Sequence, residues 1–328
     1  MNKKNIIQNI DVPFDEIMIP SKGIFYENKQ SSFLVKYLTA KEENVLTSPS
    51  LTESGRAIEM VLESCVLDWE GDISDILVGD KNAILLYLRS TSYGDTIKYT
   101  YQCPNCNKET EDKIQLSALE MKEIYNTPDN EGLFSFTLPK MKTKDKEDII
   151  VKFKPRTVGD EIKINTIIRD EKTILNGNKI DNSIQARYFV QIKKINDNNN
   201  EKYIKQILKM MPISDSYALR TFMDEVEPGI NNVVTTTCTN CQHVSNNIIP
   251  INSNFFGLTP EYRTNMMDEV FLISYYGKGG HTRGEIYKMP IYERRWTMER
   301  IAEEVDKKNQ AEKAAAAKAK SSSKSKKV

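Results

Sequence analysis

Histidine is scarce in this chain of 328 residues, which contains His243 and His281 and no others. Neither has a serine or cysteine partner in a recognisable nucleophile setting. The glycine-rich Gly277-Lys-Gly-Gly280 does not match the phosphate-binding pattern G-x-x-x-x-G-K-[ST] after a strand, and it is typical of a turn that ends a helix. Acidic pairs such as Glu42-Glu43 and Glu303-Glu304 have the spacing of helix surfaces. The sequence therefore predicts that the protein is not an enzyme and has no small-molecule substrate.

Long apolar runs are also missing. No stretch approaches the roughly 18 apolar residues of a membrane-spanning helix. The first seven residues lack the continuous apolar segment of a signal peptide. With 39% hydrophobic and 28% charged residues, the composition is ordinary for a soluble globular chain. We therefore expect no membrane association and a reducing, cytoplasmic compartment.

Net charge is absent from the chain as a whole but not from its parts. Residues 306–328 carry eight lysines against Asp306 and Glu312, a net charge of +6, so the remaining residues carry −6. An acidic body argues against a nucleic-acid platform over the whole surface. We expect 306–328 to be a Lys/Ala/Ser-rich disordered tail, although its Ala/Lys run can be helical in patches.

Cysteine is rare too, yet four of the five cysteines form two C-x-x-C pairs, Cys103/Cys106 and Cys238/Cys241. A β-prone run precedes each pair and an alternating polar and apolar run follows it, which predicts two hairpins with thiols at their tips. One pair cannot complete a tetrahedral site, whereas two pairs supply the four thiolates of a structural zinc site. We therefore predict one structural Zn²⁺, with these four cysteines as ligands.

Other interpretations of the pairs have less support. A redox-active C-x-x-C is expected at the start of a helix, and neither pair is there. Disulfides fit a secreted protein. His243 could replace one thiolate, but an exposed turn histidine is the simpler interpretation. Asn107 can adopt the left-handed conformation that such turns often need, and Gln242 does so less readily. Cys65 lies in an apolar run and is expected in the core.

The remaining pattern predicts an α+β fold, mostly helical with short antiparallel hairpins, and it includes the zinc-ribbon-like site. Capping boxes at Thr39–Glu42 and Thr282–Glu285 predict helix starts, and Ser117 predicts a short helix through Ile124. Between the cysteine pairs, strands around 134–138 and 149–153 and about four helices can bury a core of their own.

These patterns divide the chain into five segments. They are an N-terminal extended arm with short strands (1–38), helices with the first zinc hairpin (39–116), an inserted α+β domain (117–232), the second zinc hairpin with aromatic-rich helices (233–305), and the tail (306–328).

Aromatic, methionine and arginine residues crowd the last third of the globular part, and these types are enriched in protein interfaces. The expected helix after Pro260 carries Met267, Val270 and Phe271 at helical spacing. On the final helix, Tyr292, Arg294, Arg295 and Trp296 are predicted to bind a protein partner.

Several stretches resemble a baseplate protein family of T-even-like contractile-tailed bacteriophages, which includes baseplate hub and hub-assembly proteins. They are Pro20-Ser-Lys-Gly-Ile-Phe-Tyr26, Tyr37–Thr47, Tyr93-Gly-Asp95 and the paired C-x-x-C, within a similarity over about residues 12–256. Met289–Trp296 also resembles segments of phage tail proteins.

The resemblance implies a structural or assembly protein without enzymatic activity. It would contact hub and tail-tube proteins, in the virion or in the host cytoplasm during assembly. The alternative from the residues themselves is a zinc-ribbon nucleic-acid-binding protein that uses its basic C-terminal tail, a reading that we expect to be the weaker one.

Overall fold

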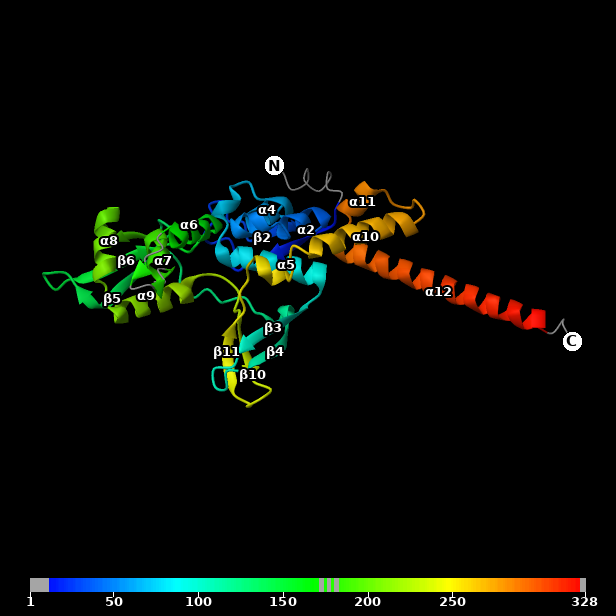
Figure 1. Ribbon diagram of the computed structural model, residues 1–328. Helices are drawn as coiled ribbons and strands as arrows, with labels where there is room; N and C mark the ends of the chain where they lie inside the picture. Colours follow the sequence, from blue (N-terminus) through cyan, green and yellow to red (C-terminus); the bar gives the residue numbers. More distant parts are fainter. Residues whose placement is uncertain (1–11, 171–173, 176–177, 180–182, 325–328) are drawn as a thin grey trace.

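The computed structural model describes residues 12–170, 174–175, 178–179 and 183–324. Three groups of elements surround a helical body: a lobe of helices and strands at one end, a pair of hairpins below, and a long helix that leaves the other end (Figure 1). Every strand pairing among the described residues is antiparallel. The predicted α+β class, mostly helical with short hairpins, is confirmed.

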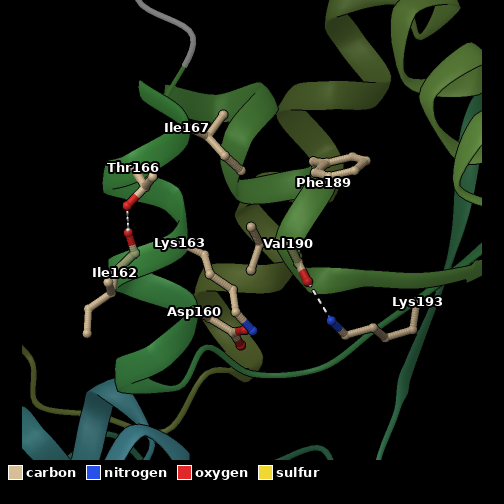
Figure 2. A pocket seen from close by; sticks show the side chains of 8 residues that line it. All are labelled: Asp160, Ile162, Lys163, Thr166, Ile167, Phe189, Val190 and Lys193. Atoms are coloured by element: carbon tan, nitrogen blue, oxygen red, sulfur yellow. Dashed lines mark hydrogen bonds between the residues drawn. The ribbon is translucent and has the colours of Figure 1, made fainter. Parts of the chain in front are cut away.

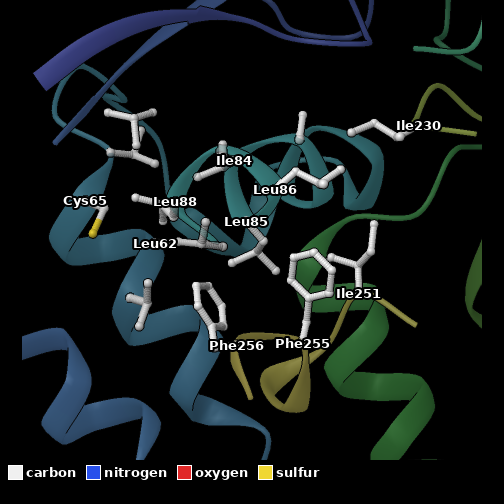
Figure 3. Close-up of a cluster of buried hydrophobic side chains, with 14 of the residues drawn as sticks. Leu62, Cys65, Ile84, Leu85, Leu86, Leu88, Ile230, Ile251, Phe255 and Phe256 are labelled. Atoms are coloured by element: carbon white, nitrogen blue, oxygen red, sulfur yellow. The ribbon is translucent and has the colours of Figure 1, made fainter. Parts of the chain in front are cut away.

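The helical body packs around α4 and α5. Its elements are β1 (Phe14–Met18), β2 (Ser32–Lys36), α2 (Ala40–Leu46), α3 (Pro49–Glu53), α4 (Arg56–Cys65) and α5 (Val78–Tyr93). Leu62 and Cys65 of α4 meet Leu85 and Leu88 of α5 in a buried cluster that also takes in Phe256 (Figure 3). Cys65 is fully buried, as predicted. The Thr39–Glu42 capping box is present at the start of α2, as the spacing predicted.

A buried carboxylate fastens the N-terminal arm to the body. The side chain of Asp80, in the first turn of α5, accepts hydrogen bonds from the backbone N–H of Ser21 at 2.9 Å and from the hydroxyl of Tyr26 at 2.6 Å. Burial raises the pKa of Asp80. The two hydrogen bonds supply the partners that a buried carboxylate needs. Because both donors belong to the N-terminal arm, they hold the arm against the helix.

The lobe between the hairpins contains a three-stranded sheet in the order β5-β6-β9 with helices packed around it. Its elements are β5 (Phe134–Lys142), β6 (Asp148–Phe153), α6 (Val158–Asp170), α7 (Ser183–Gln191), β9 (Ile192–Ile195), α8 (Glu201–Met210) and α9 (Ile213–Val226), and the two-residue strands β7 (Ile174–Leu175) and β8 (Asn178–Lys179) lie between α6 and α7. One buried cluster is formed by residues between Phe134 and Val226. This lobe corresponds to the predicted inserted domain, whose independence stays a prediction.

Two local predictions for this lobe are wrong. A third strand, β9, follows α7 without a break, where the sequence predicted a strand pair alone. The predicted helix from Ser117 through Ile124 is a single turn, Leu116–Ala118, after which Met121 pairs with Ile230. The backbone of this stretch bonds to the returning chain instead, with the N–H of Lys122 donating to the carbonyl of Gly229 at 2.8 Å. Tertiary pairing outweighs the local helix signal here.

The C-terminal part consists of α10 (Tyr262–Tyr276), α11 (Arg283–Lys288) and α12 (Ile291–Lys324). Thr282 and Glu285 form the predicted capping box of α11. Disorder was predicted for the tail at 306–328, and this is wrong as far as Lys324, where α12 ends. Residues 325–328 lie outside the described part of the chain. At 1.5 Å per residue its 34 residues span about 51 Å, and its far end points away from the body (Figure 1). Within the described part of the chain, no helix has the length and apolarity that crossing a membrane requires.

Candidate metal centre

Two matching hairpins carry the cysteine pairs. The first joins β3 (Thr96–Gln102) to β4 (Glu109–Gln115), and the second joins β10 (Val233–Thr237) to β11 (Val244–Ile248). The last pairs before the turns are Gln102 with Glu109 and Thr237 with Val244. Six residues connect the strands in each case, so the hairpins correspond position by position. We call residues 103–108 and 238–243 the two knuckles.

The knuckles share the same backbone hydrogen bonds. Cys103 N–H donates to Lys108 C=O and Asn107 N–H donates to Cys103 C=O, both at 2.9 Å. Cys238 makes the equivalent pair of bonds, with His243 and Gln242, also at 2.9 Å. Asn107 and Gln242 have φ angles of 55° and 58°. The left-handed conformation, predicted more readily for Asn107, therefore occurs at both positions and turns each chain so that its two thiols face the same side.

The four sulfur atoms come together between the knuckles. The Sγ atoms of Cys103 and Cys241 lie 3.7 Å apart, and so do those of Cys106 and Cys238. All four lie within 4.8 Å of one another. Sulfurs about 2.3 Å from a central Zn²⁺ stand about 3.8 Å apart in a regular tetrahedron. The donor set and its spacing therefore fit a metal ion of this size, and no change of fold is needed to admit one.

Polar side chains surround the thiols. The amide Nδ2 of Asn105 lies 3.6 Å from the Sγ of Cys241, and the Thr110 hydroxyl lies 3.6 Å from the Sγ of Cys238. Lys108 Nζ donates to Asn240 Oδ1 at 2.8 Å, which links the two knuckles directly. Hydrogen bonds of this kind orient metal ligands and balance the negative charge of the sulfurs.

The local field favours thiolates at the second knuckle. The backbone N–H of Cys241 and then the hydroxyl of Thr110 lower the pKa of Cys238 to about 6. The Asn105 amide and then the backbone N–H of His243 lower the pKa of Cys241. A thiolate is the form that binds a metal, so this knuckle is prepared for that role.

The rival interpretations of the cysteines find no support in this geometry. All five cysteines are free of disulfides. The imidazole of His243 is not part of the sulfur cluster. Both C-x-x-C pairs lie at hairpin tips, not at a helix start where a redox-active thiolate is stabilised. The arrangement can hold a metal that joins two segments 132 positions apart in the chain.

The predicted partner-binding residues divide into two groups. Tyr292 and Trp296 are exposed on α12, and Arg295 is half-buried, with its guanidinium 4.7 Å from the ring centre of Tyr93. The prediction that Arg294 binds a partner is wrong. Its side chain is fully buried between Glu43 of α2 and Glu269 of α10 and forms ion pairs with both. Arg294 therefore holds the helices together and cannot reach a partner.

The α10 helix has an exposed aromatic face. The sequence pattern placed Met267, Val270 and Phe271 on this helix, and its buried residues are Met266, Val270 and Ile273. Phe271 and Tyr275, which follow Met267 at four-residue spacing, are 61% and 66% exposed, and their rings stack at 5.6 Å. The helix is apolar on both faces, so periodicity could not tell which face is covered.

Comparison with known proteins places the chain in a family. The match to the family model described as T4 bacteriophage base plate protein extends over residues 24–257, more than two thirds of the chain. Neither the curated proteins nor the solved structures contain a match. The matched segment includes both knuckles and the lobe between them, and it ends before α10. The chain belongs to the T4 bacteriophage base plate protein family, whose members are structural proteins of the virion with other baseplate proteins as partners.

Proposed function

We propose that this protein is a zinc-stapled structural or assembly protein of the baseplate hub, without enzymatic activity. The observation that carries the proposal is the four-thiol cluster, because it ties the two ends of the intervening lobe together at one point. A site built from distant segments contributes its binding free energy directly to folding. Cys103, Cys106, Cys238 and Cys241 would hold one Zn²⁺, whose part is to cross-link the two hairpins.

The hub contacts are assigned to the exposed aromatic residues of the C-terminal helices. Tyr292 and Trp296 on α12, and Phe271 and Tyr275 on α10, are all large and at least 46% exposed. Aromatic side chains are enriched at the centres of protein interfaces. The partners would be hub and tail-tube proteins, met in the host cytoplasm during assembly or in the finished tail.

The test is binding to purified hub and tail-tube proteins. We expect the wild-type chain to bind at least one of them, and Tyr292→Ala with Trp296→Ala to weaken that binding at least tenfold, about 1.4 kcal/mol. Tyr125→Ala is the matched control, since Tyr125 is an 83% exposed aromatic outside this surface. A stable monomer that binds none of these proteins would contradict the proposal.

The nucleic-acid alternative has its own test. The projecting end of α12 carries Lys307, Lys308 and Lys313, all exposed. If it binds DNA, affinity should fall steeply with salt, by about one counterion per phosphate contact. Removal of residues 307–328 should then abolish a DNA interaction that tail assembly needs. Under the hub proposal, the shortened chain keeps its affinity for hub proteins.

A further inference from the structure

A hollow on the lobe, remote from the cysteines and from the C-terminal helices, lies between α6 and α7. It measures about 400 Å³ and is open to solvent. Ile167 of α6 lies across from the Phe189 ring in the upper part of the view, Val190 of α7 lies in the middle, and the Lys163 and Lys193 side chains lie below (Figure 2). The exposed surface inside the hollow is mostly apolar. An open apolar hollow of this kind suits side chains of another protein better than a small molecule, which needs enclosure on most sides.

The charges at its rim are unbalanced. Lys163 is exposed and Lys193 is half-buried, and Lys205 of α8 places its ammonium 4.2 Å from the ring centre of Phe189. Burial and then the charge of Lys154 lower the pKa of Lys193, whereas the charge of Asp160 opposes this shift and Lys163 adds to it. Of the residues that line the hollow, Asp160 is the one acid, and its carboxylate already accepts the Thr157 N–H at 3.2 Å. The Lys193 ammonium donates to the Val190 carbonyl at 2.6 Å (Figure 2) and keeps further N–H groups for an incoming anion.

We propose that this hollow binds an acidic amphipathic segment of a neighbouring protein. Apolar side chains of that segment occupy the space over Ile167, Val190 and Phe189, and its carboxylates pair with Lys163 and Lys193. Helix-in-groove recognition works in this way, with apolar anchors one turn apart and charges at the edge. A nucleic-acid strand would instead require a row of exposed aromatic rings for its bases, and the lining here is largely aliphatic.

The hollow is remote from the C-terminal helices. The α6–α7 pair lies at one end of the molecule and α12 leaves from the other (Figure 1). The protein could therefore bind one partner at the hollow and a second at the exposed aromatic residues of α10 and α12 at the same time. Binding at the hollow does not depend on the hub contacts proposed above. An experiment can therefore contradict one of the two proposals and leave the other standing.

The experiment uses the full-length chain and a fluorescein-labelled peptide of about 18 residues, five helical turns, with glutamate on one face and leucine on the other. Binding is followed by fluorescence anisotropy at about 0.1 M salt. We expect saturable binding that Lys163→Glu weakens at least tenfold and Phe189→Ser weakens further. A peptide with the same composition in scrambled order should not bind. The matched control is Lys209→Glu, an exposed lysine on α8 that does not line the hollow.

Lys163 is the decisive position because its exposed side chain makes Lys163→Glu compatible with folding, which far-ultraviolet circular dichroism and thermal unfolding check. Three outcomes overturn the proposal. The first is absence of peptide binding up to about 1 mM. The second is binding that Lys163→Glu and Lys209→Glu weaken equally. The third is a duplex DNA oligonucleotide, or a phosphatidylserine vesicle, that binds more tightly than the peptide and loses affinity with Lys163→Glu.

Discussion

Arg294 carries a positive charge into the junction of three helices. Its Nε donates to Glu269 at 2.8 Å, a second guanidinium nitrogen pairs with Glu43, and Glu43 also accepts from the Tyr93 hydroxyl at 2.9 Å. Burial raises the pKa of Glu43 even though Arg294 opposes this effect. Removal of one member of such a buried pair leaves the other charge without compensation. Arg294 thus fastens α12 and α10 to α2.

The first prediction concerns that pair. Arg294→Met should lower the free energy of unfolding by about 3–5 kcal/mol, because Glu43 remains buried without its partner. Urea unfolding followed by circular dichroism measures it. Arg300→Met, on the exposed part of α12, should change stability by less than about 0.5 kcal/mol. Addition of Glu43→Gln to Arg294→Met should recover part of the loss. A cost below about 1 kcal/mol for Arg294→Met would contradict this account.

The second prediction concerns the metal. The wild-type protein, purified without chelator, should contain one zinc per chain, and Cys238→Ser should lose it because three thiolates leave the site open. Elemental analysis measures the content. Cys65→Ala is the matched control, since Cys65 is buried in the helical core and its loss should cost stability without loss of zinc. Wild-type protein that contains no zinc would contradict the prediction.

At the scale of elements, Glu227 joins the parts of the lobe. It follows α9 and accepts hydrogen bonds from the guanidinium of Arg156, before α6, at 2.8 Å, and from the Gln191 amide, at the end of α7, at 2.8 Å. Arg187 of α7 lies 3.4 Å away. Burial alone would raise the pKa of Glu227, but the charge and hydrogen bonds of Arg156 and the charge of Arg187 outweigh it, so the pKa is lowered.

The third prediction follows from the sign of that shift. A carboxyl with a lowered folded pKa stabilises the protein fully above its unfolded pKa, about 4.3, and this contribution is lost as pH falls through the folded value. Glu227→Gln should therefore destabilise the protein at pH 7, and the gap to wild type should narrow below about pH 4.3. Urea midpoints at several pH values measure it. Glu225→Gln, an exposed position on α9, should show little gap at any pH, and a gap for Glu227→Gln that widens in acid would contradict the assignment.

At the scale of the whole molecule, the lobe returns to the body through a close backbone contact. A Cβ at Gly79 of α5 would come within 1.9 Å of the carbonyl oxygen of Pro228. Lys81 of α5 pairs with Glu161 of α6 at 2.6 Å nearby, and Val78 N–H donates to the Arg156 carbonyl at 2.9 Å. The body and the lobe therefore meet along the first turn of α5.

The fourth prediction is that Gly79→Ala destabilises the protein by more than about 1 kcal/mol, although alanine at a helical position is ordinarily favoured over glycine by about that amount. The reason is the clash with Pro228. Thermal unfolding measures the change. Gly284→Ala, in α11, where an added Cβ would meet only the Thr282 hydroxyl at 4.0 Å, should be neutral or slightly stabilising. A stabilising Gly79→Ala would show that the close approach is absent in solution.

The fifth prediction concerns zinc removal from the whole chain. Chelation should speed amide hydrogen exchange in β3, β4, β10 and β11, because each hairpin alone is marginal. The core between Phe134 and Val226 is separate from the thiols and should keep its protection. Exchange measured by mass spectrometry with and without chelator tests this. Loss of protection in both regions at once would mean that the lobe does not fold by itself, against its proposed status as a domain.

Much of the fold followed from local chemistry in the sequence. Both capping boxes, at Thr39 and Thr282, start helices, because a side chain three residues on satisfies the backbone at the helix start. The two cysteine pairs predicted both hairpins, since the spacing within each C-x-x-C is a local property. The four thiolates that a structural zinc site requires predicted that the two pairs would meet. The zinc itself and the hub partners stay predictions.

Tertiary structure decided which of several possible faces was covered. Arg294 is buried because two acidic side chains from α2 and α10 meet it, and no local pattern reveals partners so distant in the chain. Phe271 is exposed because α10 packs through Val270 and Ile273 instead. The sequence by itself determined the hairpins, the capped helices and the thiol pair at each hairpin tip, whose causes lie within a few residues. Which helix face is buried, and where charges converge at Lys163 and Lys193, depends on packing between distant segments, and only the tertiary structure could decide it.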